Sequence, residues 1–296
     1  MTKPPKVAVL GSINMDLVCT TEKRPEPGET VLGTGFTMVP GGKGANQAIA
    51  ARRSDALVEF LGAIGRDMFT TPLREVLNDS DVGGARLRSL PGSSGVATIV
   101  VEQGGENSII VTPGANARLT ELDDADLETI AEADILLCQL EIPVETVTAG
   151  ARHARAHGTT VILNPSPVRE LPEELWREID VAVVNSGEAD RLGTALDRIA
   201  HVITTRGADG ADYRGPGGEL HCPSPKVRVV DTTGAGDAFT GALAAAWHRG
   251  PERALAWACA AGALAATELG ASKSIPDADS IAMLLGDPLL NPGSNR

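Results

Sequence analysis

The sequence predicts an α/β protein in which helices cover both faces of a mostly parallel central sheet. Three observations lead to this fold class. Short apolar runs rich in β-branched residues alternate with segments of helical spacing along most of the 296 residues. Each run ends in polar or glycine-containing sequence, which is typical of strands buried on both faces. Two further stretches have strand-like runs on either side of a tight turn, which predicts a small second β-sheet.

The predicted elements follow one another in a regular order. Strands are expected at 7–10, 59–64, 135–140, 161–164, 181–185 and 202–205. Apolar residues at helical spacing predict helices at 44–53, 68–78, 122–131, 144–157, 188–200 and 240–248. Such alternation is typical of strand–helix–strand units, and it places ligand-binding groups at the carboxyl ends of the strands.

Residues 16–40 and 95–111 interrupt this alternation. In the first stretch, Val18-Cys-Thr-Thr21 leads into a Pro-Glu-Pro-Gly turn, and in the second, residues 96–101 lead into Gln-Gly-Gly-Glu. Both patterns are typical of antiparallel strand pairs. We expect them to form a β lid that is inserted at two points of a single domain spanning residues 1–296.

Composition and charge exclude several classes of protein. The net charge of −13 has the wrong sign for a nucleic-acid-binding surface, and an aromatic content of 3% leaves little for base stacking. The four cysteines are widely spaced and form no C-x-x-C pair, which disfavours a zinc site or a disulfide framework. There is no apolar stretch of the ~20 residues that a membrane span needs, and no signal peptide is recognisable. We therefore expect a cytoplasmic protein that binds neither nucleic acid nor membranes.

The densest chemical signal is Asp231-Thr-Thr-Gly-Ala-Gly-Asp237, which precedes a predicted helix. Small residues at a strand-to-helix junction leave backbone N–H groups open at the positive end of the helix dipole, which suits phosphate oxygens. Asp237 would lie beside that anion, where a carboxylate can accept the proton of an attacking hydroxyl. An isolated Gly-x-Gly-Asp is more often a capped helix start, but the longer motif with two aspartates favours the catalytic interpretation.

Two other motifs offer hydrogen-bonding groups for a polyol. Gly41-Gly-Lys-Gly-Ala-Asn-Gln47 opens a predicted helix and lacks the spacing of a Walker A loop. Its Lys43 and Asn46 can bind hydroxyls, or they merely solvate the start of the helix. Gly11-Ser-Ile-Asn-Met-Asp16 ends the first strand, where Asn14 and Asp16 can bind adjacent hydroxyls. A solvated turn residue is the alternative for Asp16.

Three weaker signals remain. Asn185-Ser-Gly-Glu188 ends a buried strand, and its Glu188 either holds Mg²⁺ through water or serves as a helix-start carboxylate. The stretch 205–210 either lines a nucleotide pocket or forms a hairpin bend. Glu141 is an ordinary surface acid unless it faces the lid. The five histidines show neither a triad-like nor a ligand-like pattern, so Ser-His-Asp hydrolysis has no support.

Taken together, the motifs resemble the ribokinase branch of the phosphofructokinase-B sugar kinases over residues 7–276. The resemblance rests on six segments in family order: 11–16, 41–47, Gly114-Ala-Asn116, Asn164-Pro-Ser-Pro-Val-Arg-Glu-Leu-Pro172, 185–188 and 231–237. It implies a ribokinase-like three-layer α/β/α sandwich with a small β-sheet lid, and phosphoryl transfer from ATP to the 5-hydroxyl of D-ribose. Asp237 would be the catalytic base, and the backbone of Gly234, Ala235 and Gly236 would stabilise the transferring group.

The resemblance also implies binding residues, position by position. Sugar contacts fall on Asn14, Asp16, Gly42, Lys43, Asn46, Glu141 and Asp237. Nucleotide contacts fall on Asn185, Thr205, Arg206, Gly207, Ala208, Asp209, Gly210, Gly236 and Cys259. Glu188 matches an acid associated with Mg²⁺ through water. A K⁺ site is matched by Asp231, Thr233, Ala265, Glu268, Gly270 and Ser274, several of them through backbone carbonyls.

The family's lid also pairs subunits, so the resemblance implies a homodimer. The departures from the family pattern lie on the nucleotide side. The segment between Glu188 and Thr205 is shorter, and the sequence Asn185-Ser-Gly-Glu differs from the usual one. Arg206 stands where the family commonly has a small apolar residue, and Cys259 stands where it often has His or Asn. We expect them to affect nucleotide binding more than sugar chemistry. Two alternatives stay open, namely a sister kinase acting on 2-deoxyribose, fructose or a nucleoside such as pseudouridine, and a non-catalytic sugar-binding regulator.

Overall fold

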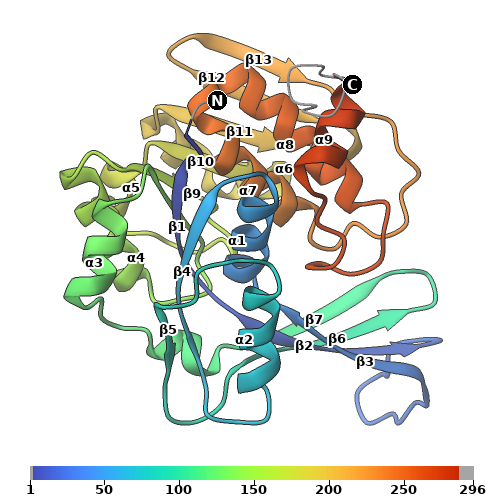
Figure 1. Ribbon diagram of the computed structural model, residues 1–296. Coiled ribbons are helices and arrows are strands. Elements are labelled where there is room, and N and C mark those ends of the chain that lie inside the picture. Colours follow the sequence, from blue (N-terminus) through green and yellow to red (C-terminus); the bar gives the residue numbers. More distant parts are fainter. Residues whose placement is uncertain (1–2, 287–296) are drawn as a thin grey trace, which may run out of the picture.

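The computed structural model describes residues 3–286 and is built on a nine-stranded sheet (Figure 1). In spatial order its strands are β13 (Gly218–Cys222), β12 (Ala211–Gly215), β11 (His201–Thr205), β10 (Val181–Asn185), β9 (Thr160–Leu163), β8 (Ile135–Cys138), β1 (Lys6–Leu10), β4 (Leu57–Ile64) and β5 (Leu87–Ser89). Neighbours pair in parallel from β11 to β5, whereas β12 and β13 form an antiparallel edge. The mostly parallel sheet is therefore confirmed.

Helices cover both faces of this sheet because successive residues of a strand point to opposite sides. Val7 and Val9 of β1 pack with α1 (Lys43–Arg53), α2 (Thr70–Asn78), α7 (Ala235–Ala246), α8 (Pro251–Ala265) and α9 (Ala278–Leu285). Ala8 and Leu10 pack with α3 (Asp124–Ala131), α4 (Val144–Ala156) and α5 (Glu173–Glu178). The result is the predicted three-layer sandwich. None of the described helices is long and apolar enough to cross a membrane.

Several predicted boundaries are wrong. The helix expected at 188–200 is a short α6 (Ser186–Leu192) followed by a 3₁₀ segment (Gly193–Arg198), because Gly193 adopts a positive φ of 51° that ends the α-helix. The strand expected at 135–140 ends at Cys138. The helix expected at 240–248 begins at Ala235, within the glycine motif. Strands β5, β12 and β13 and helices α5 and α9 were not predicted.

A second sheet of four strands lies beside the carboxyl end of β1 (Figure 1). Its order is β3 (Gly33–Gly41), β2 (Asn14–Thr21), β6 (Gly95–Glu102) and β7 (Asn107–Thr112). The β2–β3 and β6–β7 pairs are antiparallel, as expected, and a parallel β2–β6 pairing joins them. Two stretches far apart in the sequence therefore build one sheet.

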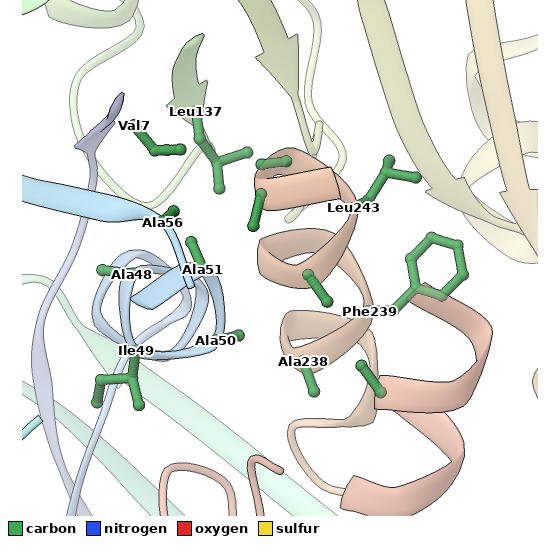
Figure 2. Packing of buried hydrophobic residues seen from close by; sticks show 14 of the residues in the cluster. Val7, Ala48, Ile49, Ala50, Ala51, Ala56, Leu137, Ala238, Phe239 and Leu243 are labelled. Carbon is green, nitrogen blue, oxygen red and sulfur yellow. The ribbon is translucent and has the colours of Figure 1, made fainter. Parts of the chain in front are cut away.

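Helices α1 and α7 pack closely at Gly241, and this contact positions the site. Figure 2 shows Ala50 of α1 directed toward α7, the helix that carries Ala238. Gly241 makes the approach possible, because a Cβ there would lie 2.3 Å from the Gln47 carbonyl oxygen. With small residues between them, the first turns of both helices present their polar side chains to one another.

Candidate active site

The glycine motif opens α7 at the carboxyl edge of the sheet. Gly234 precedes the helix with a φ of 78°, and the first helical hydrogen bond runs from Ala238 N to Gly234 O at 2.8 Å. The N–H groups of Gly236 and Asp237 therefore have no acceptor within the helix. An anion at this end meets those donors together with the positive end of the helix dipole.

Asp237 lies in this first turn and is held by two side chains of α1. Asn46 Nδ2 donates to Asp237 Oδ2 and Gln47 Nε2 donates to Asp237 Oδ1, both at 2.9 Å. Only 9% of Asp237 is exposed. Each carboxylate oxygen keeps a further lone pair, so Asp237 can still accept a proton from a third group.

Asn14 faces the same region from the start of β2. Its Oδ1 accepts from Asn116 Nδ2 at 2.7 Å, and Asn116 is fixed in turn by the N–H and C=O of Ile13 at 3.1 Å each. Asn14 Nδ2 is thereby turned away from Asn116. The fixed amide provides a donor of defined direction for a bound hydroxyl.

Glu141 connects the end of β8 to the start of α1. Its Oε2 accepts from Ser12 Oγ at 2.5 Å and from the Lys43 N–H at 3.2 Å. Burial lowers the pKa of the Lys43 ammonium. The negative charges of Asp237, Glu141 and Glu188 together raise it by more, so the pKa of Lys43 lies above its ordinary value. Glu141 faces the site, and Lys43 supplies a fixed positive charge to the site.

Asp16 is an acid with an altered affinity for protons. Burial raises the pKa of its carboxyl to about 7, and the negative charges of Glu141 and Asp237 contribute to the rise. Asp16, Glu141 and Asp237 therefore lie near one another, although they come from three separate parts of the chain. All of the predicted sugar-contacting residues are in or next to this cluster.

A cavity of about 1000 Å³ lies on the far side of the glycine motif. It is lined by most of the residues predicted to contact nucleotide, which are Asn185, Thr205, Arg206, Gly207, Ala208, Gly210, Gly236 and Cys259. Asp209 does not line it and is exposed in a 3₁₀ turn. Residues that the motifs did not indicate complete the wall, namely Ser224, Pro225, Lys226, Val227, Val229, Phe239, Gly262, Ala263 and Ala266.

A smaller cavity of about 130 Å³ joins the two regions. Lys43 and Asp237 line it together with Asn185, Thr205 and Gly236, and these last three also line the larger cavity. Asp237 is thus placed between the sugar-type cluster, which we define as the predicted sugar-contacting residues around Asp16 and Glu141, and the nucleotide-type cavity, which is the cavity of about 1000 Å³. A further cavity of about 640 Å³, bordered by Lys6, Glu59 and Glu132, holds none of the predicted site residues.

Glu188 also lines the small cavity, but it has a structural role as well. Its Oε2 accepts from the Asn185 N–H, and the Asn185 side chain accepts from the Glu188 N–H, both at 2.8 Å. This reciprocal capping box starts α6. The helix-start interpretation of Glu188 is correct, and its second oxygen remains for a water-mediated contact.

Five of the six residues of the matched K⁺ site lie on the loops before α7 and after α8, and the sixth, Ala265, is the last residue of α8. Asp231 Oδ1 accepts from Thr233 N at 2.9 Å, and its Oδ2 accepts from Gly270 N at 3.0 Å. Burial raises the pKa of Asp231, yet these N–H groups bring it below its ordinary value. Ala265 ends α8, where carbonyls lack helical donors and the dipole is negative. Oxygen ligands near the negative end of a helix dipole suit a hard monovalent cation. Glu268, another residue of the matched set, is exposed.

Mg²⁺ fits this site only as a partner of substrate phosphates. Among residues 3–286 there is no cluster of three or more His, Cys, Asp or Glu suited to a metal ion. Mg²⁺ commonly keeps several waters and binds through one or two carboxylates plus phosphates. The free oxygen of Glu188 and the open end of α7 satisfy that pattern.

Three buried amides of the site were missed at the level of sequence. Gln47 Nε2 donates to Asn164 Oδ1 at 3.1 Å as well as to Asp237, and Gln139 Nε2 donates to Gln47 Oε1 at 2.6 Å. Gln47 and Asn164 lie within recognised motifs but were given no role. Gln139 lies within the apolar run that predicted a strand at 135–140, so a polar residue inside that run was the one available signal.

Comparison with known proteins gives concordant matches. The model of the pfkB family of carbohydrate kinases matches residues 4–278. A ribokinase of Bacillus subtilis is 39% identical over 293 residues, covering 94% of this chain and 99% of that protein. A deoxyribokinase of Salmonella typhi is 35% identical and covers 80% of this chain and 84% of its own.

The matching solved structures have the same fold. An Arabidopsis thaliana ribokinase complexed with ribose and ATP aligns with a TM-score of 0.89 at 32% identity, covering 96% of this chain and 99% of that chain. A Thermotoga maritima ribokinase aligns with a TM-score of 0.88 at 34% identity, covering 96% of this chain and all of that one.

Proposed function

The chain belongs to the pfkB family of carbohydrate kinases, and we propose that it transfers the γ-phosphoryl group of ATP to the 5-hydroxyl of D-ribose. The products would be D-ribose 5-phosphate and ADP. The observation that carries the proposal is the place of Asp237, a carboxylate between a cluster of hydroxyl-binding groups and a cavity large enough for a nucleotide.

The reaction needs a base beside the attacking hydroxyl, and a γ-phosphoryl group whose leaving oxygen lies in line with that hydroxyl. Asn14, Asp16, Asn46 and Lys43 would hold the sugar, with the 5-hydroxyl against Asp237. Asp237 would take the hydroxyl proton as the oxygen attacks the γ-phosphorus, and ADP would leave into the larger cavity. The N–H groups around Gly234, Ala235 and Gly236 would stabilise the negative charge on the transferring group.

Two ions belong to the proposal. Mg²⁺ would neutralise charge on the ATP phosphates, with Glu188 reaching it through water. K⁺ would lie among Asp231, Thr233, Ala265, Glu268, Gly270 and Ser274. Because Asp231 also fixes the N–H of Gly270 and of Thr233, the same loops that would surround the ion support the start of α7.

The four-stranded sheet would act as a lid and as a dimer interface between two copies of a one-domain kinase. Phe36 and Met38 of β3 and Ile110 of β7 are exposed, and the strand register places them on one face through Cys19, Leu17 and Thr98. An exposed apolar face of this kind favours association with a second copy. We also propose a cytoplasmic location, consistent with four free cysteines.

The test is ADP release with Mg-ATP and D-ribose, measured in K⁺ buffer and in a buffer of a bulky organic cation. Ribose-dependent turnover that falls without K⁺ supports the substrate, the reaction and the cation site together. Turnover with 2-deoxyribose, fructose or a nucleoside, but not with ribose, would retain the mechanism and replace the substrate. Sugar binding by calorimetry without turnover on any member of the panel would contradict the kinase proposal.

A further inference from the structure

Behind the Asp237 carboxylate lies a chain of three buried amides, none of which faces either cavity except Asn164. Gln47 donates both hydrogens of its Nε2, one to Asp237 Oδ1 at 2.9 Å and one to Asn164 Oδ1 at 3.1 Å. Its Oε1 accepts from Gln139 Nε2 at 2.6 Å. Gln47 therefore uses every hydrogen of its amide in this one orientation.

The direction of these hydrogen bonds is fixed from both ends. Asn164 Nδ2 donates to the Val183 carbonyl at 2.8 Å, so its Oδ1 must face Gln47. A flipped Gln47 would direct its oxygen at both Asp237 and Asn164, and its nitrogen at the nitrogen of Gln139. Such a flip is unfavourable as long as Gln139 presents a donor.

The side chain of Gln139 is held in place by the residues packed around it. It is fully buried, and its Oε1 has no hydrogen-bond partner. That oxygen lies against Gly11, since a Cβ at Gly11 would come within 2.1 Å of it. A buried amide with an unsatisfied oxygen costs stability, and such costs are typical of functional sites.

We propose that Gln139 is a positioning residue: it fixes the Gln47 amide so that Gln47 donates to Asp237 and holds that carboxylate toward the sugar hydroxyl. The inference rests on the proposed phosphoryl transfer for its kinetic readout. Gln139 touches neither substrate, so its removal should lower kcat and leave the KM values for sugar and ATP almost unchanged.

Two substitutions separate this role from a structural one. Gln139→Met removes the donor and is expected to lower kcat roughly 10- to 100-fold at every pH, because the Gln47 oxygen loses its partner. Gln139→Glu behaves as a titratable version of the same side chain. When protonated it donates to Gln47 as the native amide does; when ionised it attracts the Gln47 NH₂ and turns the Gln47 oxygen toward Asp237.

The expected signature is a difference between these variants in their pH profiles of kcat. Relative to wild type, Gln139→Glu should regain activity as pH falls, whereas Gln139→Met should not. Other ionisable groups near the site, namely Asp16, Lys43, Glu141 and Asp237, are shared by all three proteins, so the ratio to wild type isolates position 139. Gln103→Glu in the exposed turn between β6 and β7 is the matched control and should keep wild-type kcat.

The outcomes are distinguishable. Wild-type kcat in both variants, or equal loss in both at every pH with raised KM and a lowered Tm, would overturn the positioning role. If wild type fails with ribose, the assay uses whichever sugar of the panel it phosphorylates. A readout without turnover is the NMR signal of the Gln47 side-chain NH₂, which Gln139→Met should shift; an unshifted signal would also overturn the inference.

Discussion

The side-chain amide of Asn46 donates a hydrogen bond of 2.9 Å to the Asp237 carboxylate, although 191 positions of sequence separate the two residues. Asn46 lies in the first turn of α1 and Asp237 in the first turn of α7. The base of the proposed reaction is therefore held by a helix from the other end of the chain. The roles of the residues around this pair lead to five predictions.

Asp237→Asn should lower kcat by about three orders of magnitude or more while sugar and ATP binding stay near wild type, because the amide cannot take the hydroxyl proton. Steady-state ADP release and calorimetry measure the two effects. Asp124→Asn on the exposed start of α3 is the control, with no expected change. Near-normal turnover in Asp237→Asn would remove Asp237 from its role as base.

Asp16→Asn should make the protein more stable at pH 8 but not at pH 4. The pKa of Asp16 is raised to about 7 in the folded state, so its favourable contribution is complete below the unfolded value near 4 and is lost as pH rises to about 7. At roughly 1.4 kcal/mol for each pKa unit, the gain in unfolding free energy is on the order of a few kcal/mol. Urea unfolding of both proteins from pH 4 to 8 measures it, and a pH-independent difference would contradict the burial of this carboxyl.

Lys226→Ala should raise the KM for ATP roughly tenfold, about the effect of one charge-assisted hydrogen bond, and should leave the KM for the sugar unchanged. Lys226 lines the nucleotide-type cavity of a chain with a net charge of −13, where local positive charge is needed to attract a polyphosphate. Lys6→Ala, at the start of β1, serves as the control. An unchanged KM for ATP would place the phosphates elsewhere.

Cys222 should react with iodoacetamide at neutral pH well before Cys138. The neighbouring Cys259 lowers the pKa of Cys222 to about 7, and His221 contributes, whereas burial raises the pKa of Cys138 above its ordinary value. Cys259→Ala should slow the labelling of Cys222 by removing that neighbour. Mass spectrometry of the labelled peptides measures the rates; equal rates at Cys222 and Cys138 would contradict this assignment.

The double variant Phe36→Asp, Ile110→Asp should convert a dimer into monomers at micromolar concentration. The two residues are 61% and 70% exposed and share one face of the four-stranded sheet, so charges there would oppose its burial against a second copy. Sedimentation velocity measures the change, with Met68→Asp as a control, because Met68 is an exposed apolar residue outside this sheet. A wild-type monomer would contradict the proposed interface.

Many strands and helices of the fold could be predicted from the sequence, because each is specified by a local pattern of residues. Strands β1, β4, β8, β9, β10 and β11 of the central sheet are largely apolar runs, and a buried parallel strand is recognisable from that pattern alone. The errors lie where the pattern is weak or interrupted. At Gly193 a positive φ ended a helix that apolar spacing had extended, and at β12 and β13 an edge hairpin with mixed side chains carried no buried run.

The sequence by itself determined which residues can carry the chemistry, because backbone freedom at Gly234 and the carboxylates of Asp16, Glu141 and Asp237 are properties of those residues. Only the tertiary structure decided how they act. Close packing of α1 on α7 delivers Asn46 and Gln47 to Asp237, and the buried Gln139 fixes Gln47 from behind. Hydrogen bonds between residues so distant in the chain leave no local pattern, since their partners are chosen by packing rather than by spacing.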